Sequence, residues 1–325
     1  GAVFMEGQNT AGYHQWATFE GVTFRSNVMR ATDRENRGAA VAFHWQVHGN
    51  FTNCTFEHNI GVTAGGSHSG RGPAIATYKQ GELLVVDSRF VNNSAGDRTT
   101  QATTARHGYG GDIYIEWAIG GTNIVGSHFE DSWSGNEGGS IRLYRSEKSV
   151  SLVNSTWLRT TAWRYYGAVY LVYATGNLTV DGCLFESTKS ERYNHGSLGV
   201  VHQYGSMLMK DTTFRNCSVT YNHSSWRRNN AAFMLNRVRD GGLITGLVSE
   251  FNNATYFAGG RIHKGGHWVV ENSVFRNNLV MGHAAYAGAI YVDYASAEFK
   301  NCSFHGNRAD RGYTGSGSCY GGALR

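Results

Sequence analysis

Residues 138–171 read GGSIRLYRSEKSVSLVNSTWLRTTAWRYYGAVYL and contain the two motifs that decide the fold. The first motif is a pair of small residues followed by an aliphatic strand, as in GGSIRL from Gly138 and YGAVYL from Tyr166. The second motif ends in an aromatic residue, as in NSTWLRT from Asn154. Two copies of the first motif therefore enclose one copy of the second, and the stretch covers one complete repeat.

The same alternation continues outward to both ends of the chain. Its aliphatic anchors are Val41, Ile75, Ile113, Ile141, Val169, Leu198, Phe233, Ile262, Ile290 and Leu324. Its aromatic anchors are Phe24, Phe56, Phe90, Phe129, Trp157, Phe185, Phe214, Phe251, Phe275 and Phe304. Consecutive aromatic anchors lie 24 to 39 residues apart. A period of this length, kept through the whole chain, is typical of a stacked repeat protein.

Each aliphatic motif alternates apolar and outward positions. Ile141 and Leu143 are separated by one residue, as are Val169 and Leu171, so both members of each pair face the same side of a strand. One strand cannot bury this face alone, but repeats stacked about 4.8 Å apart turn each inner position into a buried column. We therefore predict an all-β fold, a right-handed parallel β-helix of about ten coils, forming one domain over residues 1–325.

The aromatic motif predicts an interior ladder. We expect Phe56, Phe90 and Phe129 to lie over one another inside the helix. The residue three positions before each aromatic is Asn, Asp or Gly in most copies, which predicts a turn with left-handed backbone.

Cysteines mark a second inward column. Cys54, Cys183 and Cys302 lie two residues before an aromatic, where most other copies carry Ser or Thr, so we expect small buried side chains there. Cys217 and Cys319 are expected in loops, and the sequence leaves open whether Cys302 and Cys319 pair.

Composition excludes several classes of protein. The chain has 43 glycines but one proline, without the period of collagen. With 41% hydrophobic and 13% aromatic residues it is not expected to be disordered. It contains no 18-residue apolar stretch that could span a membrane. Its net charge of +5 includes no basic run typical of a nucleic-acid patch.

Insertions concentrate between each aromatic anchor and the next aliphatic anchor. The longest cover residues 57–72, 91–110, 215–230 and 305–321, which predicts variable loops on one corner of the coils. Taken over all coils, the segments from an aromatic anchor to the next aliphatic anchor hold most of the basic residues but fewer than half of the acidic ones. They are either solubilising loops or a partner surface, and Arg227 and Arg228 are the candidates for the second role.

Aromatic residues indicate another candidate surface. Tyr114, Tyr170 and Tyr291 occupy the outward position between inward anchors, and exposed aromatics can bind sugars or another chain. Four further aromatics follow their anchors by four residues and either extend this ladder or fold inward at the corner; the inward interpretation is favoured. They are Trp45, Trp117, Tyr173 and Tyr294.

Nine N-x-[ST] sequons indicate a secreted glycoprotein. The repeat's own turn accounts for those at Asn53, Asn154 and Asn301. The glycosylation candidates are Asn92, Asn216, Asn222, Asn253, Asn50 and Asn177.

Catalytic signals are weak. Asp87 and Asp211 occupy the turn position, and Asp112 and Asp293 lie in different coils. Glycosidases need clustered carboxylates, and the histidines have no ligand spacing. We therefore predict no enzyme activity, no metal and no cofactor.

The paired motifs resemble GGA[ILV] and FxxN repeats of chlamydial polymorphic membrane proteins. The clearest copies are GGAL at Gly321 and FxxN at Phe24, Phe56, Phe90, Phe275 and Phe304. The resemblance covers the whole chain as a fold-level pattern and implies a β-helical surface adhesin; similar repeats occur in large extracellular proteins of protists and algae. Residues 260–264, GRIHK, resemble a basic motif of pectin-degrading hydrolases, but the paired aspartates of that family are missing.

Together these patterns favour a structural or adhesive extracellular rod, part of a surface or filament assembly of a eukaryotic glycoprotein. The alternative is a carbohydrate-binding or polysaccharide-cleaving β-helix. Because no capping helix is recognisable, we expect a segment of a longer chain whose rod continues or docks end-on. The expected partners are other protein chains of the assembly, itself included, and glycans, but no nucleic acid.

Overall fold

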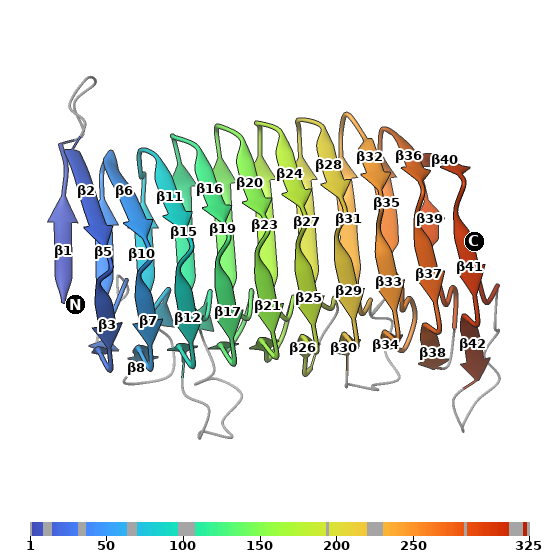
Figure 1. Cartoon of the computed structure of the whole chain (residues 1–325), viewed down its shortest axis with the longest axis horizontal. Coiled ribbons are helices and arrows are strands. Elements are labelled where there is room, and N and C mark those ends of the chain that lie inside the picture. The colour runs from blue at the N-terminus through green and yellow to red at the C-terminus, as the bar shows by residue number, and fades with distance from the viewer. Residues whose placement is uncertain are drawn as a thin grey trace.

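The computed structural model describes residues 2–8, 15–31, 37–63, 70–96, 108–192, 195–219, 230–282, 285–311 and 321–323. Four ten-stranded parallel sheets run side by side along one axis, and each coil contributes one strand to each sheet (Figure 1). The chain is thus a parallel β-helix, and the predicted all-β solenoid of about ten coils is confirmed.

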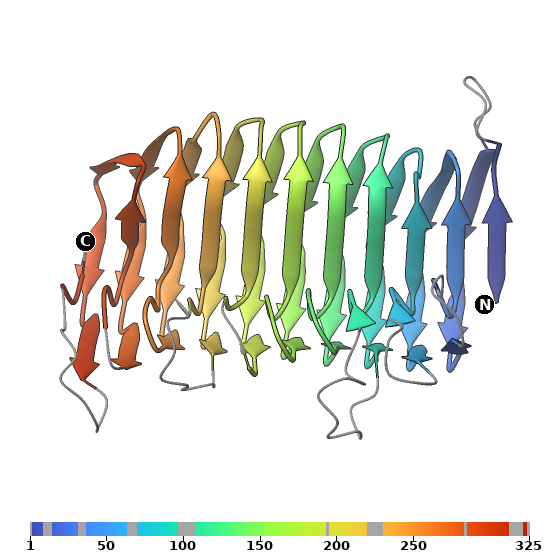
Figure 2. The same ribbon diagram turned by 180° about the vertical axis from the view of Figure 1, so that it is seen from behind.

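Sheets A and B form the two longer faces. Sheet A, which faces the viewer in Figure 2, holds the aliphatic motifs. Its strands are β1 (Val3–Glu6), β5 (Val41–His44), β10 (Ile75–Tyr78), β15 (Ile113–Ala118), β19 (Ile141–Ser146), β23 (Val169–Ala174), β27 (Leu198–Gln203), β31 (Phe233–Val238), β35 (Arg261–Gly265) and β39 (Tyr291–Asp293). Sheet B comprises β2 (Gln15–Glu20), β6 (Val47–Thr52), β11 (Leu83–Val86), β16 (Thr122–Val125), β20 (Val150–Val153), β24 (Leu178–Asp181), β28 (Met207–Lys210), β32 (Gly242–Thr245), β36 (His267–Glu271) and β40 (Ser296–Lys300).

Sheets C and D complete each coil. Sheet C holds the aromatic motifs in β3 (Thr23–Arg25), β7 (Thr55–Glu57), β12 (Arg89–Val91), β17 (His128–Glu130), β21 (Thr156–Leu158), β25 (Leu184–Glu186), β29 (Thr213–Arg215), β33 (Val248–Glu250), β37 (Val274–Arg276) and β41 (Ser303–His305). Sheet D was not predicted, because most of its strands are only two residues long. They are β4 (Val28–Ala31), β8 (Ile60–Thr63), β13 (Ser94–Ala95), β18 (Trp133–Ser134), β22 (Thr161–Ala162), β26 (Lys189–Ser190), β30 (Ser218–Val219), β34 (Asn253–Ala254), β38 (Leu279–Gly282) and β42 (Arg308–Arg311).

The connection from sheet D to sheet A varies most in length. It runs directly from Ser134 to Ile141 in one coil but from Ala95 to Ile113 in another. The longer connections include the paired strands β9 (Gly70–Arg71) and β14 (Gly108–Tyr109). The predicted variable corner is therefore the D–A corner.

The aromatic anchors stack inside the helix. The rings of Phe56, Phe90 and Phe129 are fully buried, and neighbouring centroids lie 4.6–4.8 Å apart. This dry column continues through Trp157, and such rings each contribute roughly 1.5–3 kcal/mol of burial.

One aromatic anchor differs from the prediction. Phe251 is 50% exposed, and Ser249 takes the interior position between Phe214 and Phe275. Ser249 donates to the carbonyl oxygen of Gly259 (2.8 Å), and Phe233 of sheet A packs on Phe214. The register therefore shifts by two residues relative to the simple aromatic spacing.

The asparagine of FxxN forms a second interior ladder. The Asn59 side chain donates to the carbonyl oxygen of Phe24 (3.0 Å) and to Oδ1 of Asn93 (2.9 Å). Asn93 in turn donates to Phe56 and to Oδ1 of Asp112. Each amide thus satisfies backbone groups that the corner would otherwise bury unpaired.

The cysteine column is interior. Cys54 and Cys183 are buried, Cys302 is half-buried in the last coils, and the pKa of the Cys183 thiol is raised to about 12 by burial. Cys217 lies in the short connection between β29 and β30, as expected, but it is fully buried there, in the asparagine column. Cys319 lies outside the described residues.

Candidate functional site

The corner between sheets A and B carries one outward column of large side chains. These residues share one register position of sheet A, the position that follows His44 in β5. Along the axis they are Trp45, Lys79, Trp117, Arg145, Tyr173, His202, Arg237, Lys264 and Tyr294. We call this set the corner ladder. The connections from sheet A to sheet B form the upper edge of the rod in Figures 1 and 2.

Every member of the corner ladder has a left-handed backbone, with φ between 49° and 65°. This conformation directs the side chains away from the core. Tyr294 is 78% exposed, Tyr173 is exposed, and Trp45 and Trp117 are half-buried. The favoured expectation that these four aromatics fold inward is therefore wrong, because a chain turning through this region presents the side chain to solvent.

Cations and rings alternate along the first half of the corner ladder, from Trp45 to Tyr173. The Lys79 Nζ lies 4.2 Å from the centroid of Trp45 and 4.7 Å from that of Trp117. Arg145 covers the other side of Trp117 at 5.5 Å, and the Trp117 indole N–H donates to Glu147 (2.7 Å). Such cation–π contacts contribute about 0.5–1 kcal/mol each at exposed sites.

The second half of the corner ladder borders an open pocket. It has a volume of ≈ 410 Å³ and is lined by His202, Tyr204, Arg237, Arg239 and Gly265. The Arg237 Nη1 lies 3.0 Å from His202 Nε2. Burial and the neighbouring Arg237 charge lower the pKa of His202, which keeps this imidazole neutral near pH 7.

The outward tyrosines of sheet A occupy a different setting from the expected one. Tyr114 is 3% exposed, so its expected role as a free surface residue is corrected. It packs against Arg71 and Arg142, its hydroxyl donates to Glu116 (3.2 Å), and burial raises its pKa to about 12. The D–A connection covers this face and converts it into a packed layer.

The other two tyrosines of that set are half-buried. Tyr170 stacks on Tyr166 at 4.2 Å, and Tyr291 contacts Phe257 at 4.5 Å. Arg227 and Arg228 of the predicted surface lie outside the described residues.

A buried ion cluster lies on the outer side of sheet A at the motif that resembled a hydrolase sequence. Arg261 is 3% exposed and donates twice to Asp293, at 3.1 and 2.8 Å. The His263 Nδ1 lies 2.8 Å from the same carboxylate. With Arg261 on both of its oxygens, Asp293 is held as an ion-pair partner.

Carboxylates on sheet C are also held by arginines. Hydrogen bonds from Arg89 and Arg159 lower the pKa of Glu130 to about 2 against the effect of burial. Burial disfavours ionisation of Glu250, but Arg215 and Arg276 outweigh it and lower its pKa. Among the described residues no group of three or more His, Cys, Asp or Glu could hold a metal ion.

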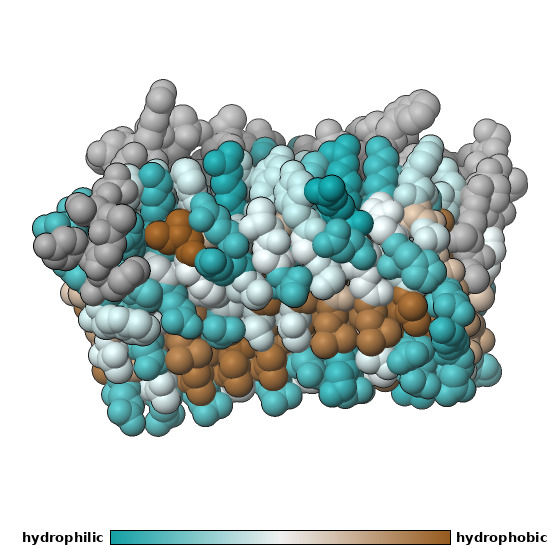
Figure 3. All heavy atoms as spheres, turned by 90° about the horizontal axis from the view of Figure 1, so that it is seen from above, coloured by the Kyte–Doolittle hydropathy of each residue, from teal (hydrophilic) through white to brown (hydrophobic). Residues whose placement is uncertain are grey.

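The outer face of sheet B carries two apolar blocks. Three strands, β11, β16 and β20, supply half-buried Leu84, Val86, Val125 and Val153, and another three, β28, β32 and β36, supply Leu208, Leu243 and Val269. Seen from above, hydrophobic side chains gather in two patches along the rod (Figure 3).

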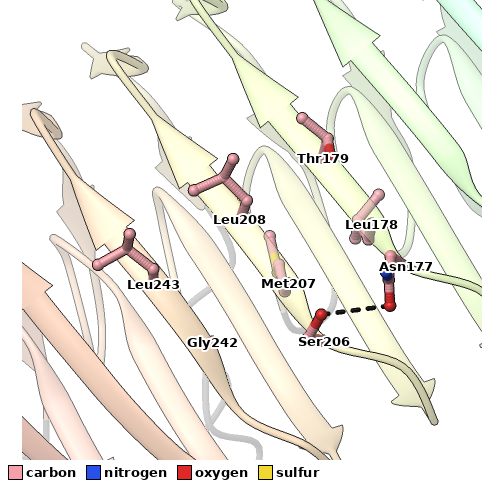
Figure 4. A pocket seen from close by; sticks show the side chains of 8 residues that line it. All are labelled: Asn177, Leu178, Thr179, Ser206, Met207, Leu208, Gly242 and Leu243. Carbon is pink, nitrogen blue, oxygen red and sulfur yellow. Dashed lines mark hydrogen bonds between the residues drawn. The ribbon is translucent and has the colours of Figure 1, made fainter.

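The second apolar block borders a shallow pocket of ≈ 400 Å³. Leu208 and Leu243 project side by side from neighbouring strands, beside Thr179 (Figure 4). At the start of β24, Asn177 accepts a hydrogen bond from the Ser206 hydroxyl at 3.2 Å. The sequon asparagine therefore lies at the edge of this block.

The other sequons lie on the surface. Asn216 and Asn253 are exposed, like Asn177, and Asn50 and Asn92 are half-exposed. Asn222 lies outside the described residues.

Comparisons with known proteins identify no relative: the sequence matches no protein-family model, no curated protein and no solved structure. In the described part of the chain, no helix long and apolar enough to cross a membrane is present.

The sequence pointed to only part of the corner ladder. The four aromatics were visible at a fixed distance from their anchors. The alternating cations were missed, although Lys79, Arg145, Arg237 and Lys264 occupy the same repeat position. Aligning every coil at that position would have found them.

Proposed function

We propose that this protein is an extracellular structural or adhesive rod, part of a surface or filament assembly, and that sheet B forms its contact with a second copy of the chain. The observation that carries the proposal is the pair of apolar blocks on an otherwise regular outer face. Apolar patches rimmed by polar residues are typical of protein interfaces.

The arrangement of the blocks favours a symmetric contact. The first block lies on the three strands before β24 and the second on the three strands after it. A two-fold axis along β24 therefore brings the three strands of the first block in one copy opposite the three strands of the second block in the other. Self-complementary surfaces of this kind are the usual basis of homodimers.

Charged residues of both signs border the two apolar blocks. The Lys210 ammonium lies 3.8 Å from Asp181, and the Lys300 ammonium lies 3.0 Å from Glu298. Because neither sign dominates on this face, two copies can approach without strong repulsion.

The test replaces apolar residues of the second block by aspartate. We expect Leu208→Asp with Leu243→Asp to abolish self-association of the secreted protein, measured by analytical ultracentrifugation at tens of micromolar. The matched control, Val91→Asp with Leu158→Asp, changes two half-buried outward residues of sheet C and should leave association intact.

Two results would contradict the proposal. One is a wild-type protein that stays monomeric over this range. The other is equal loss of association in both double variants with unchanged thermal unfolding, because the effect would then not be specific to sheet B.

The corner ladder supports carbohydrate binding as a second candidate function. Its rings and cations are the side-chain types that contact sugars and their acidic groups.

A further inference from the structure

We propose that the corner ladder is a binding strip for an anionic polysaccharide, with the pocket between His202 and Gly265 receiving one of its acidic groups. The proposal does not depend on self-association through sheet B, because the corner ladder and the apolar blocks use different residues.

The first argument is the composition of the corner ladder. Nine successive coils place an aromatic or basic residue there, and only the first coil, with Gly7 in register with Trp45, places a glycine. The B–C corner has the same left-handed backbone at the equivalent turn and uses only Gly, Asn and Asp. The backbone therefore does not require large residues at the A–B corner.

The second argument is energetic. A left-handed conformation costs an ordinary L-residue free energy, because its Cβ approaches the following carbonyl oxygen. Nine such residues repeat this cost in nine coils, although a glycine or asparagine would reduce it. Ordinary L-residues such as Arg159 and Phe251 also take this backbone at the C–D corner, but that corner mixes them with Ser, Asn, Asp and Gly. Repeated strain at one set of aromatic and basic side chains is a recognised feature of functional surfaces.

The third argument is the pairing of the cations. Within the described ranges, no carboxylate lies within 4 Å of the charged nitrogens of Lys79, Arg145, Arg237, Arg239 or Lys264. Arginines elsewhere, by contrast, are paired: those of the D–A connection hold Glu116, and those of sheets A and C hold Glu137, Glu250 or Asp293. The positive charges of the corner are thus available to an anion from solution.

The pocket gives this surface a defined receptor for one group. Two guanidinium groups, Arg237 and Arg239, border a ≈ 410 Å³ hollow with the Tyr204 ring. Arginine binds carboxylate and sulfate-like oxygens through paired hydrogen bonds. The volume lies within the range of small-ligand sites, so a sugar unit with its acidic substituent fits.

The form of the ladder favours a polysaccharide over a nucleic acid. Single-stranded nucleic acids stack their bases on free aromatic faces. Here Lys79 lies over both Trp45 and Trp117, and Tyr173 stacks on His202 at 4.8 Å. The ring edges and the cations therefore remain accessible to an extended polyanion. They are arranged about one coil spacing apart.

The test measures binding of dextran sulfate by isothermal titration calorimetry at low ionic strength, with neutral dextran and a poly(dT) oligonucleotide as comparison probes. We expect binding to dextran sulfate alone, weakening as salt is added because the contact is electrostatic. Arg237→Ala with Arg239→Ala should weaken it about tenfold or more.

The matched control is Lys189→Ala with Lys300→Ala, which removes the same charge from sheets D and B. We expect a change below about twofold, because exposed ion pairs contribute little to fold stability and these lysines are remote from the corner. Thermal unfolding of both variants shows whether they are folded.

Three outcomes overturn the proposal. They are no binding of dextran sulfate, an equal loss of affinity in both double variants, and competition by poly(dT) as strong as that by dextran sulfate. The second result would indicate a general effect of charge. The third would exclude an anionic polysaccharide as the specific ligand.

Discussion

The A–B corner and the B–C corner make the same left-handed turn with opposite residue types. In the coil of β23 and β24, Tyr173 turns the A–B corner with φ of 59° and Gly182 turns the B–C corner with φ of 61°. The second corner uses residues that adopt this backbone at low cost. The first uses residues that adopt it at a cost, so its side chains must be selected for something other than the turn.

The largest expected effect is the slow alkylation of a buried cysteine thiol next to the B–C corner. Cys183 follows Gly182, and its pKa of about 12, against an ordinary 9.0, leaves about a thousandfold less thiolate at neutral pH. We expect alkylation by iodoacetamide at pH 8 to be at least a hundredfold slower in the folded protein than in urea, measured by mass spectrometry. Rapid labelling of folded Cys183 would show that this corner opens.

The second test places a large residue at the B–C corner. Gly182→Tyr combines φ of 61° with a Cβ that would lie 2.2 Å from Asn154 Oδ1. We expect the free energy of unfolding to fall by about 2 kcal/mol, measured by urea denaturation. No loss would mean that both corners tolerate large residues equally, and the comparison would fail.

The third test separates both corners from the ion pairs of sheet C. The pKa of Glu130 is lowered in the folded state from 4.5 to about 2, so the stability that it supplies is present above pH 4.5 and lost as the pH falls toward 2. We expect Glu130→Gln to reduce this acid dependence, with a cost below about 1 kcal/mol at pH 7. Gly182→Tyr should leave the acid dependence unchanged; urea denaturation at several pH values measures both.

The smallest effect is expected at the A–B corner. Tyr173→Gly relieves the left-handed strain but loses the stack on His202 and increases the freedom of the unfolded chain. These terms nearly cancel, so the free energy of unfolding should change by less than about 0.5 kcal/mol. A loss comparable with that of Gly182→Tyr would show that Tyr173 is structural.

The sequence predicted the parts of the fold that repeat with local chemistry. Alternation in strands such as Ile141–Leu143 located sheet A, and the Phe56 column located sheet C. The Asp87 turn, with φ of 47°, also followed from residue type. These features depend on neighbours in sequence or on one identical neighbour in the next coil.

The remaining features depend on contacts between unlike positions. The exposed Phe251 misled the alignment because Ser249 is compensated by Phe233 from another sheet. Tyr114 is buried by the D–A connection. The alternation of apolar residues in a strand does not predict the path of that connection. The cations of the corner ladder were missed because Lys and Arg at one position look like ordinary surface residues.

The interruption of the aromatic stack at Ser249 has a mechanical consequence. Between Phe214 and Phe275 the interior column passes through a hydroxyl that holds Gly259 and an amide of Asn252, where other coils hold stacked rings. Under tension along the rod, the coil of β33 should therefore yield first, and a pulling measurement on single molecules would record its rupture as the weakest step.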